Sequence, residues 1–267
     1  MEIRILGSLS VTEGDVELIP SAPKLRQILA LLLFNESHVV PTGSLLTELW
    51  DESPPRSAMT TLQTHVLRFR VMLAERLGLT PAAVAGDILQ TRRGGYRLTL
   101  GATSFDLREY RELEALGAEA LRAGDRVAAS HRFAEALDQW RGPALLDVAQ
   151  GRLLRAAVAR LDESRLNVLR LLLDAQLSEG RHREVLSVLA RLVVHHPFDQ
   201  GLHGQFMVAL HRSGYRARAL EVFARLREDM FRELGGGPSA ELVRLRHMIR
   251  VSDASILEGR MVPAAGA

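Results

Sequence analysis

The sequence predicts an α+β domain followed by an all-α domain of helical repeats. Strand and helix patterns mix in residues 1–101, whereas helix patterns alone fill residues 105–251. The second region also matches itself at a spacing of 34 residues, which indicates repeated helix pairs. We therefore expect domains at 1–101 and 102–251, followed by a flexible tail at 252–267.

Composition places the chain among ordinary globular proteins, with 267 residues of which 47% are hydrophobic and 25% charged. No apolar run approaches the roughly 18–20 residues that a membrane-spanning helix needs. The apolar stretch at the N-terminus is too short for a signal peptide. Cysteine is absent, which excludes disulfides and thiolate chemistry. We expect a cytoplasmic protein with no membrane partner.

The elements of the first domain follow from alternation, helical spacing and turn residues. Pro20 and Pro23 separate the first strands from the first helix, and Pro54 and Pro55 separate the second helix from the third. The expected order is strands at 2–9 and 16–19, a helix at 24–35, an extended piece at 38–40, a helix at 41–50, a third helix from 56, a connector at 78–86, and a strand–turn–strand at 87–98.

The third helix has an apolar stripe and a polar face. The stripe follows the spacing i, i+4, i+7, i+11 and consists of Leu62, Val66, Phe69 and Leu73. Opposite the stripe or on its flanks we expect Thr60, Thr61, Gln63, Thr64, Arg68 and Val71. Hydroxyl groups can approach phosphate or a thymine methyl, glutamine can read adenine, and arginine can read guanine. An ordinary solvated face is the alternative for this helix taken by itself.

Charge and the adjoining hairpin favour nucleic acid over a merely solvated face. Residues 56–97 hold seven arginines and two carboxylates, whereas residues 1–55 hold three cations and eight carboxylates. A phosphate backbone would experience this contrast, which the overall charge of +2 hides. Arg92, Arg93 and Arg97 lie at the hairpin, where they can contact phosphates or the minor groove. Together these features predict a winged helix-turn-helix that reads DNA.

The candidate DNA-binding residues lie on the third helix, on the hairpin and near two helix starts. For Arg26 and Arg56, simple surface charge is the alternative, and Tyr96 is expected to anchor the hairpin on the core more than to touch DNA. The full set is Arg26, Arg56, Thr60, Thr61, Gln63, Thr64, His65, Arg68, Arg70, Arg92, Arg93, Tyr96 and Arg97.

The helical region repeats at an offset of 34 residues. The matched pairs are Gly180 and Gly214, Leu186 and Leu220, Ala190 and Ala224, Arg191 and Arg225, Leu192 and Leu226, Ala175 and Ala209, and Val188 and Val222. Glycine between two helices, with alanine where helices pack closely, is typical of tetratricopeptide repeats. Residues 120–140 resemble an earlier unit of the same kind. An irregular helical bundle is the alternative.

No pattern supports catalysis. His195 and His196 are adjacent and point about 100° apart on a helix, which suits a shared metal ion poorly. The glycines at 235–237 lack the Lys-Ser/Thr of a phosphate loop, and no Gly-x-Ser-x-Gly elbow is present. We expect no enzyme activity, no catalytic residue, no cofactor and no metal.

Residues 1–100 resemble the winged-helix domain of the Streptomyces antibiotic regulatory protein (SARP) family, which is itself similar to the DNA-binding domain of OmpR-type response regulators. The similarity is carried by residues 5–9, 23–32, 45–50, 61–70 and 95–98. Residues 103–251 resemble the family's bacterial transcriptional activation domain, through residues 105–106, 140–142, 196–197, 214–220 and 234–235 with Pro238.

The resemblance implies a pathway-specific transcriptional activator. Proteins of this family bind short direct repeats in double-stranded DNA upstream of secondary-metabolite biosynthetic promoters and help RNA polymerase, with its sigma factor, engage there. A homodimer arranged head to tail on DNA is therefore expected. No ATPase segment follows the repeats and no receiver domain precedes the DNA reader, so we expect neither nucleotide control nor phosphotransfer control within this chain.

Two departures and two alternatives accompany this interpretation. Residues 198–200, Phe-Asp-Gln, replace an expected Leu-Arg-Glu, and Phe69 stands where leucine is usual. One alternative is a helical-repeat interaction or sensor protein whose N-terminal domain does not read DNA specifically. The other adds a small molecule bound among the repeats, although no sequence pattern indicates a pocket.

Overall fold

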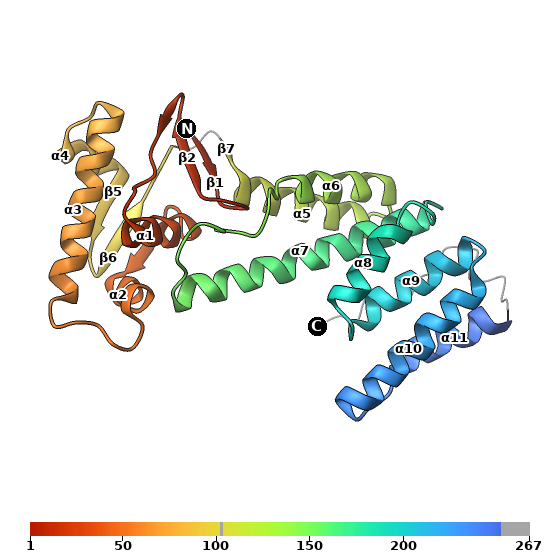
Figure 1. Cartoon of the computed structure of the whole chain (residues 1–267). Helices are drawn as coiled ribbons and strands as arrows, with labels where there is room; N and C mark the ends of the chain where they lie inside the picture. The colour runs from red at the N-terminus through yellow and green to blue at the C-terminus, as the bar shows by residue number, and fades with distance from the viewer. Residues whose placement is uncertain (102–103, 252–267) are drawn as a thin grey trace. The chain divides into compact units, whose positions relative to one another are not determined.

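A computed structural model describes residues 1–101 and 104–251 (Figure 1). The tail predicted at 252–267 lies outside the described residues. The chain forms two compact units: residues 1–114 with 135–166, and residues 115–134 with the chain from 167 onward. The first unit thus contains the whole N-terminal α+β region together with parts of the helical region. Among the described residues, no helix is both long and apolar enough to cross a membrane.

The first sheet of this unit has the strand order β3-β2-β1-β7. Its strands are β1 (Glu2–Arg4), β2 (Ser10–Glu13), β3 (Val16–Glu17) and β7 (Ser104–Phe105). Ile3 pairs with Val11 in the antiparallel direction and with Phe105 in the parallel direction. The prediction of helix alone from residue 105 onward is therefore wrong at its start, because β7 includes Phe105.

The first strand is also shorter than predicted, since β1 ends at Arg4 rather than near residue 9. The backbone N–H groups of Ile5 and Leu6 donate to the carboxylate of Asp106 at 2.8–2.9 Å. These groups are then unavailable to a neighbouring strand, which ends the ladder.

Three helices and a second sheet complete the α+β region. The helices are α1 (Pro23–Phe34), α2 (Thr42–Trp50) and α3 (Ala58–Leu77). The sheet has the order β4-β6-β5, with β4 (Val39–Pro41), β5 (Leu89–Arg92) and β6 (Gly95–Leu98). Figure 1 shows α3 beside β5 and β6. This order of three helices and a terminal hairpin is that of a winged helix, as predicted.

Two details of this region differ from the predictions. The third helix begins at Ala58 rather than at residue 56. The connector contains a short helix α4 (Pro81–Ala83) and a π-helical turn η1 (Val84–Ile88), so the hairpin begins at Leu89 rather than at residue 87. Val84 is fully buried, which gives this turn an anchor in the core.

Buried carboxylates bind the α+β region to the helices that follow it within the first unit. The three helices that follow are α5 (Asp106–Arg122), α6 (Arg126–Asp138) and α7 (Arg152–Ser178), of which the first unit includes residues 106–114 and 135–166 only. Glu48 on α2 is 2% exposed and accepts the backbone N–H groups of Gly151, Leu153 and Leu154 at 2.6, 2.9 and 3.0 Å. A carboxylate at a helix N-terminus satisfies free donors and complements the helix dipole. Glu48 therefore caps α7 from a distant part of the chain.

The helical turns repeat one geometry. Gly124, Gly180 and Gly214 have φ values of 80°, 86° and 89°, and in each case the next residue donates its N–H to a carbonyl five residues earlier. A residue with this left-handed backbone conformation at the end of a helix is usually glycine. The spacing from Gly180 to Gly214 agrees with the 34-residue offset. Ala175 and Ala209 are buried as expected for close packing, but Ala224 is exposed.

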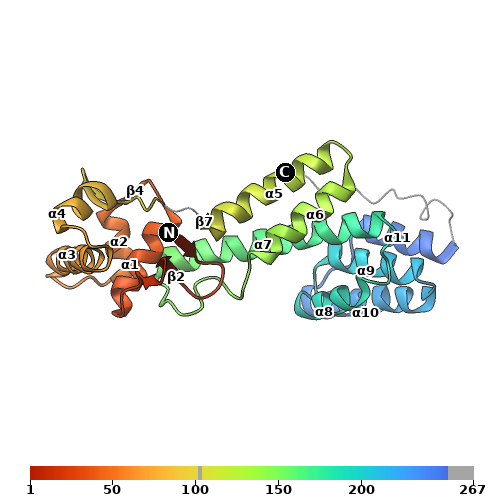
Figure 2. The ribbon, with the colours of Figure 1, turned by 90° about the horizontal axis from the view of Figure 1, so that it is seen from above.

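The last four helices lie side by side in the second unit (Figure 2). They are α8 (Leu186–His195), α9 (Gln200–Arg212), α10 (Arg216–Leu234) and α11 (Ala240–Val251). The middle helix α9 is the most deeply buried of them, with every residue from 205 to 210 inside the core. The region thus has the stacked helix pairs of a tetratricopeptide-like domain.

Candidate nucleic-acid interface

The apolar stripe of α3 is buried, and this fixes which residues face outward. Leu62, Val66, Phe69 and Leu73 are all at most 2% exposed. The residues two positions before each of them lie on the opposite side of the helix and are exposed: Thr60, Thr64, Leu67 and Val71. We call this set the reading face. It is long, continuous and made of small or medium side chains, which suits entry into a DNA major groove.

Leu67 is a member of this face that the sequence analysis missed. It is 58% exposed and lies between Thr64 and Val71 along the helix. Its position could have been predicted, because Leu67 lies two residues before Phe69 of the apolar stripe and therefore on the opposite side of the helix. Apolar side chains on such a face are suited to thymine methyl groups.

Polar side chains flank the reading face on both sides. Gln63 and Arg68 are exposed, and Thr61 and His65 are half-buried. Helix geometry places Gln63 on the flank of Arg70, which contacts the hairpin, and the other three residues on the opposite flank. Burial lowers the pKa of the His65 imidazole from its usual value, and the positive charges of Arg68 and Lys24 lower it further. His65 is therefore a neutral donor and acceptor near pH 7.

The β5–β6 hairpin is a wing with a basic tip. Arg92 and Arg93 are both exposed there. The side-chain oxygen of Gln90 accepts hydrogen bonds from Arg92 at 2.7 Å and from Arg97 at 2.5 and 2.8 Å. One amide thus holds two guanidinium groups on the same strand pair. Within residues 1–101 and 104–251, Arg93 has no such partner and is free to bind an anion.

Two predicted residues support the wing instead of facing outward. Arg70 donates to the carbonyl of Leu89 at 2.7 and 2.9 Å and to the hydroxyl of Thr91 at 2.8 Å, which ties α3 to β5. Tyr96 is 8% exposed and so anchors β6 in the core. Beside it, a Cβ on Gly95 would lie 2.1 Å from the carbonyl oxygen of Val40, so only glycine fits where β6 runs along β4.

The two predicted arginines near helix starts have different roles. Arg26 forms an ion pair with Asp147, whose other oxygen accepts the N–H of Leu9 at 2.8 Å. Arg26 therefore contributes to holding the α+β region on the helical segment, and its charge is largely neutralised. Arg56 is exposed in the loop before α3 and stays available to phosphate.

The structure thus brings together most of the predicted set. The reading face, its flanking residues and the wing are neighbours through the Arg70 contacts, whereas Arg26 and Tyr96 are used internally. No group of three or more His, Cys, Asp or Glu side chains in the described part of the chain is arranged to hold a metal ion.

Comparisons with known proteins agree with this architecture. Residues 16–98 match the family described as "Transcriptional regulatory protein, C terminal", and residues 105–250 match the family described as "Bacterial transcriptional activator domain". The regulatory protein DnrI of Streptomyces peucetius is 42% identical over 99% of this chain and 98% of its own length.

Other relatives are longer than this chain. The transcriptional regulator RedD of Streptomyces coelicolor is 34% identical, and the chain spans 73% of it. The regulatory protein AfsR of Streptomyces griseus is 32% identical, and the chain spans 26% of it. The solved structure of Mycobacterium tuberculosis EmbR with a low-affinity phosphopeptide superposes with a TM-score of 0.84 at 28% identity, covering 94% of this chain and 65% of EmbR.

The fold and these matches define a transcriptional regulator with a winged-helix domain and an activator domain. The chain belongs to the Streptomyces antibiotic regulatory protein family of transcriptional activators. DnrI, RedD and AfsR are all named as regulators rather than enzymes.

Proposed function

We propose that this protein binds short direct repeats in double-stranded DNA and activates promoters of a secondary-metabolite biosynthetic gene cluster. The observation that carries the proposal is the exposed reading face of α3 lying beside a wing tipped by Arg92 and Arg93. A helix with its outer face free, next to a basic hairpin, can read bases and hold the neighbouring phosphates at the same time.

Each part of the interface has a distinct task in this proposal. Thr60 and Thr64 approach bases or phosphates, Gln63 and Arg68 read base edges from the two flanks, and Leu67 packs on a thymine methyl. The guanidinium groups of the wing contact phosphates or the minor groove, which adds affinity without base discrimination. Arg70 and Tyr96 position the wing against α3.

The helical region serves protein contacts in this proposal, with domains divided at residues 101 and 102. Stacked helix pairs offer surfaces for helices or peptides, which suits contacts with RNA polymerase and its sigma factor. Two protomers arranged head to tail place their reading faces on successive repeats, so the operator is a direct repeat rather than a palindrome.

Selection of genomic DNA fragments by the purified full-length protein, followed by footprinting, tests the proposal. At near-physiological salt, a few promoters should be enriched and protected over a short direct repeat. Binding must also weaken steeply with salt, because phosphate contacts release counterions. Diffuse binding without a protected repeat would contradict sequence-specific reading and favour an N-terminal domain that serves protein contacts.

A further inference from the structure

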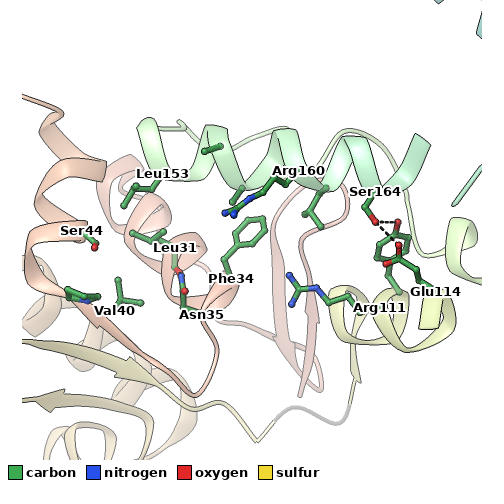
Figure 3. Close-up of a pocket in the computed structure, with 15 residues that line it drawn as sticks. Leu31, Phe34, Asn35, Val40, Ser44, Arg111, Glu114, Leu153, Arg160 and Ser164 are labelled. Atoms are coloured by element: carbon green, nitrogen blue, oxygen red, sulfur yellow. Dashed lines mark hydrogen bonds between the residues drawn. The ribbon is translucent and has the colours of Figure 1, made fainter. Parts of the chain in front are cut away.

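The first unit contains a cavity that the DNA-reading function does not use (Figure 3). Its volume is about 590 Å³, and its walls come from the end of α1, the start of α2, α5 and α7. Small-molecule sites in proteins typically have volumes of about 300–1,000 Å³. The reading face of α3 contributes no lining residue, so the cavity is separate from the proposed DNA interface.

One side of the cavity is apolar. Leu31 and Phe34 from α1 and Leu153 and Leu161 from α7 line it. Leu31 and Leu161 are 4% and 6% exposed, so their positions are fixed by the surrounding core. This surface offers a flat ring or an aliphatic chain a place to leave water.

Two guanidinium groups enter the same space from opposite helices. Figure 3 shows Arg111 from α5 and Arg160 from α7 both extending toward Phe34. Throughout the described ranges, neither arginine has a hydrogen-bond acceptor or an ion-pair partner. Nearby arginines of the same unit do have partners, such as Arg108 with Glu36 at 2.7 Å and Arg141 with Asp106 at 3.4 Å. Arg111 and Arg160 are both exposed, so their two positive charges lie beside an apolar surface and are open to an anion from solution.

The carboxylate that lines the cavity is hydrogen-bonded to a hydroxyl and, among the described residues, forms no ion pair with either arginine. Glu114 accepts a hydrogen bond from the hydroxyl of Ser164 at 3.1 Å, and that hydroxyl lies 2.7 Å from the hydroxyl of Tyr110. Burial raises the pKa of Tyr110 to about 12, so this phenol keeps its proton at neutral pH. Glu114 is thus part of a polar chain at one end of the cavity, as the dashed lines in Figure 3 show.

We propose that this cavity binds a small organic acid. Arg111 and Arg160 hold its anionic group, and Leu31, Phe34 and Leu153 contact its apolar body. Paired guanidinium groups favour carboxylate, sulfonate or phosphate oxygens through charge-assisted hydrogen bonds. An inorganic anion would leave the apolar surface uncovered, and a folded partner is too large for this volume. The site lies beyond the proposed DNA-reading function and requires no DNA.

Titration of the full-length protein with 8-anilinonaphthalene-1-sulfonate tests this site, because the dye combines a sulfonate with an apolar aromatic body. Its fluorescence should rise with a saturable curve for one site per chain. Naphthalene-2-sulfonate should displace it, whereas sulfate or 1-naphthylmethylamine at equal concentration and ionic strength should not. Displacement by sulfate as effective as by naphthalene-2-sulfonate would overturn the apolar part of the proposal.

Substitutions test whether the dye binds in this cavity or elsewhere on the protein surface. The double variant Arg111→Ala/Arg160→Ala should bind the dye at least about tenfold more weakly, since hydrogen bonds to charged groups are each worth roughly that factor. Arg122→Ala is the matched control, because Arg122 is exposed on the same helix α5 but does not line the cavity. Equal affinities of the double variant and the control would overturn the proposal.

A third variant keeps both charges and fills the space. Ala157 on α7 lines the cavity and is half-buried, so Ala157→Trp should block the apolar body. Loss of dye binding with an unchanged circular dichroism spectrum supports the site. Retained wild-type affinity in a folded Ala157→Trp protein would place the dye elsewhere and contradict the proposal.

Discussion

The reading face of α3 and the carboxylates that bind the α+β region to the helical segment use polar residues in opposite ways. Arg68, Gln63 and Thr60 are exposed, and Arg68 and Thr60 retain donors or acceptors for an external molecule. Glu48 and Asp106 are buried, and backbone N–H groups satisfy their oxygens. The helix residues proposed to read DNA are thus exposed to solvent, whereas the buried carboxylates are fully partnered within the protein. Arg93 and Arg26 differ in the same way, because Arg93 is exposed at the wing tip and Arg26 forms an ion pair with Asp147.

The largest effect is expected on stability, at the fully partnered carboxylate of Glu48. Glu48→Ala leaves three backbone donors at the start of α7 and the amide of Gln27 without their carboxylate acceptor. Unsatisfied buried donors are costly, so the free energy of unfolding should fall by about 3 kcal/mol or more in urea titrations. Glu112→Ala, at an exposed position on α5, is the control and should stay within about 0.5 kcal/mol of wild type.

A chemical refinement distinguishes capping from simple packing at this site. Glu48→Gln preserves the shape of the side chain but replaces one acceptor oxygen by a donor facing N–H groups. This variant should also be clearly less stable than wild type. Wild-type stability of Glu48→Gln would show that shape alone matters and would contradict the capping role.

The second-largest effect is expected from a substitution of Arg68, which should lower DNA affinity without lowering stability. Arg68→Ala should weaken binding to the protected repeat by about 1–3 kcal/mol if Arg68 reads a base, and discrimination at that base should relax. Its unfolding free energy should stay near wild type because the side chain is exposed. Fluorescence anisotropy at several salt concentrations measures both quantities, with Arg122→Ala as the control. A uniform loss across sequences, with a salt slope reduced by about one unit, would assign Arg68 to phosphate.

The reading face could be predicted from the sequence because it follows local periodicity. The stripe at Leu62, Val66, Phe69 and Leu73 fixes the orientation of α3, and the paired glycines at a 34-residue spacing mark equivalent turns. Both signals can be read along the sequence itself, from the spacing of similar residues. Their structural meaning therefore does not depend on distant parts of the chain.

The carboxylate contacts could not be predicted in this way. Glu48 meets residues 103 to 106 positions away, and Asp106 meets Ile5 and Leu6 at separations of 101 and 100. Such pairs leave no local pattern, so β7 and the early end of β1 were both missed. The use of Arg70 by the wing escaped prediction for the same reason, since its partners depend on where β5 lies.

A smaller effect is expected from the apolar part of the reading face. Leu67→Ala should weaken specific DNA binding by about 1 kcal/mol, the value of roughly one buried methylene, if Leu67 covers a thymine methyl. Replacing single thymines of the repeat by uracil removes that methyl from the other side of the contact. In a double-mutant cycle the uracil cost should vanish in Leu67→Ala. Equal uracil costs in both proteins would show that Leu67 does not touch that methyl.

The smallest effect is a dependence of DNA affinity on pH through His65. Its pKa lies below the usual value in the free protein because of burial and the neighbouring charges of Arg68 and Lys24. A nearby phosphate favours the protonated form and raises this pKa, so DNA binding takes up a proton when the pH lies between the two values. Affinity should therefore increase a few-fold as the pH falls from 7.5 to 5.5. His65→Gln keeps a polar side chain but cannot titrate, so its affinity should change less over this range; an equal change in both proteins would assign the dependence to another group.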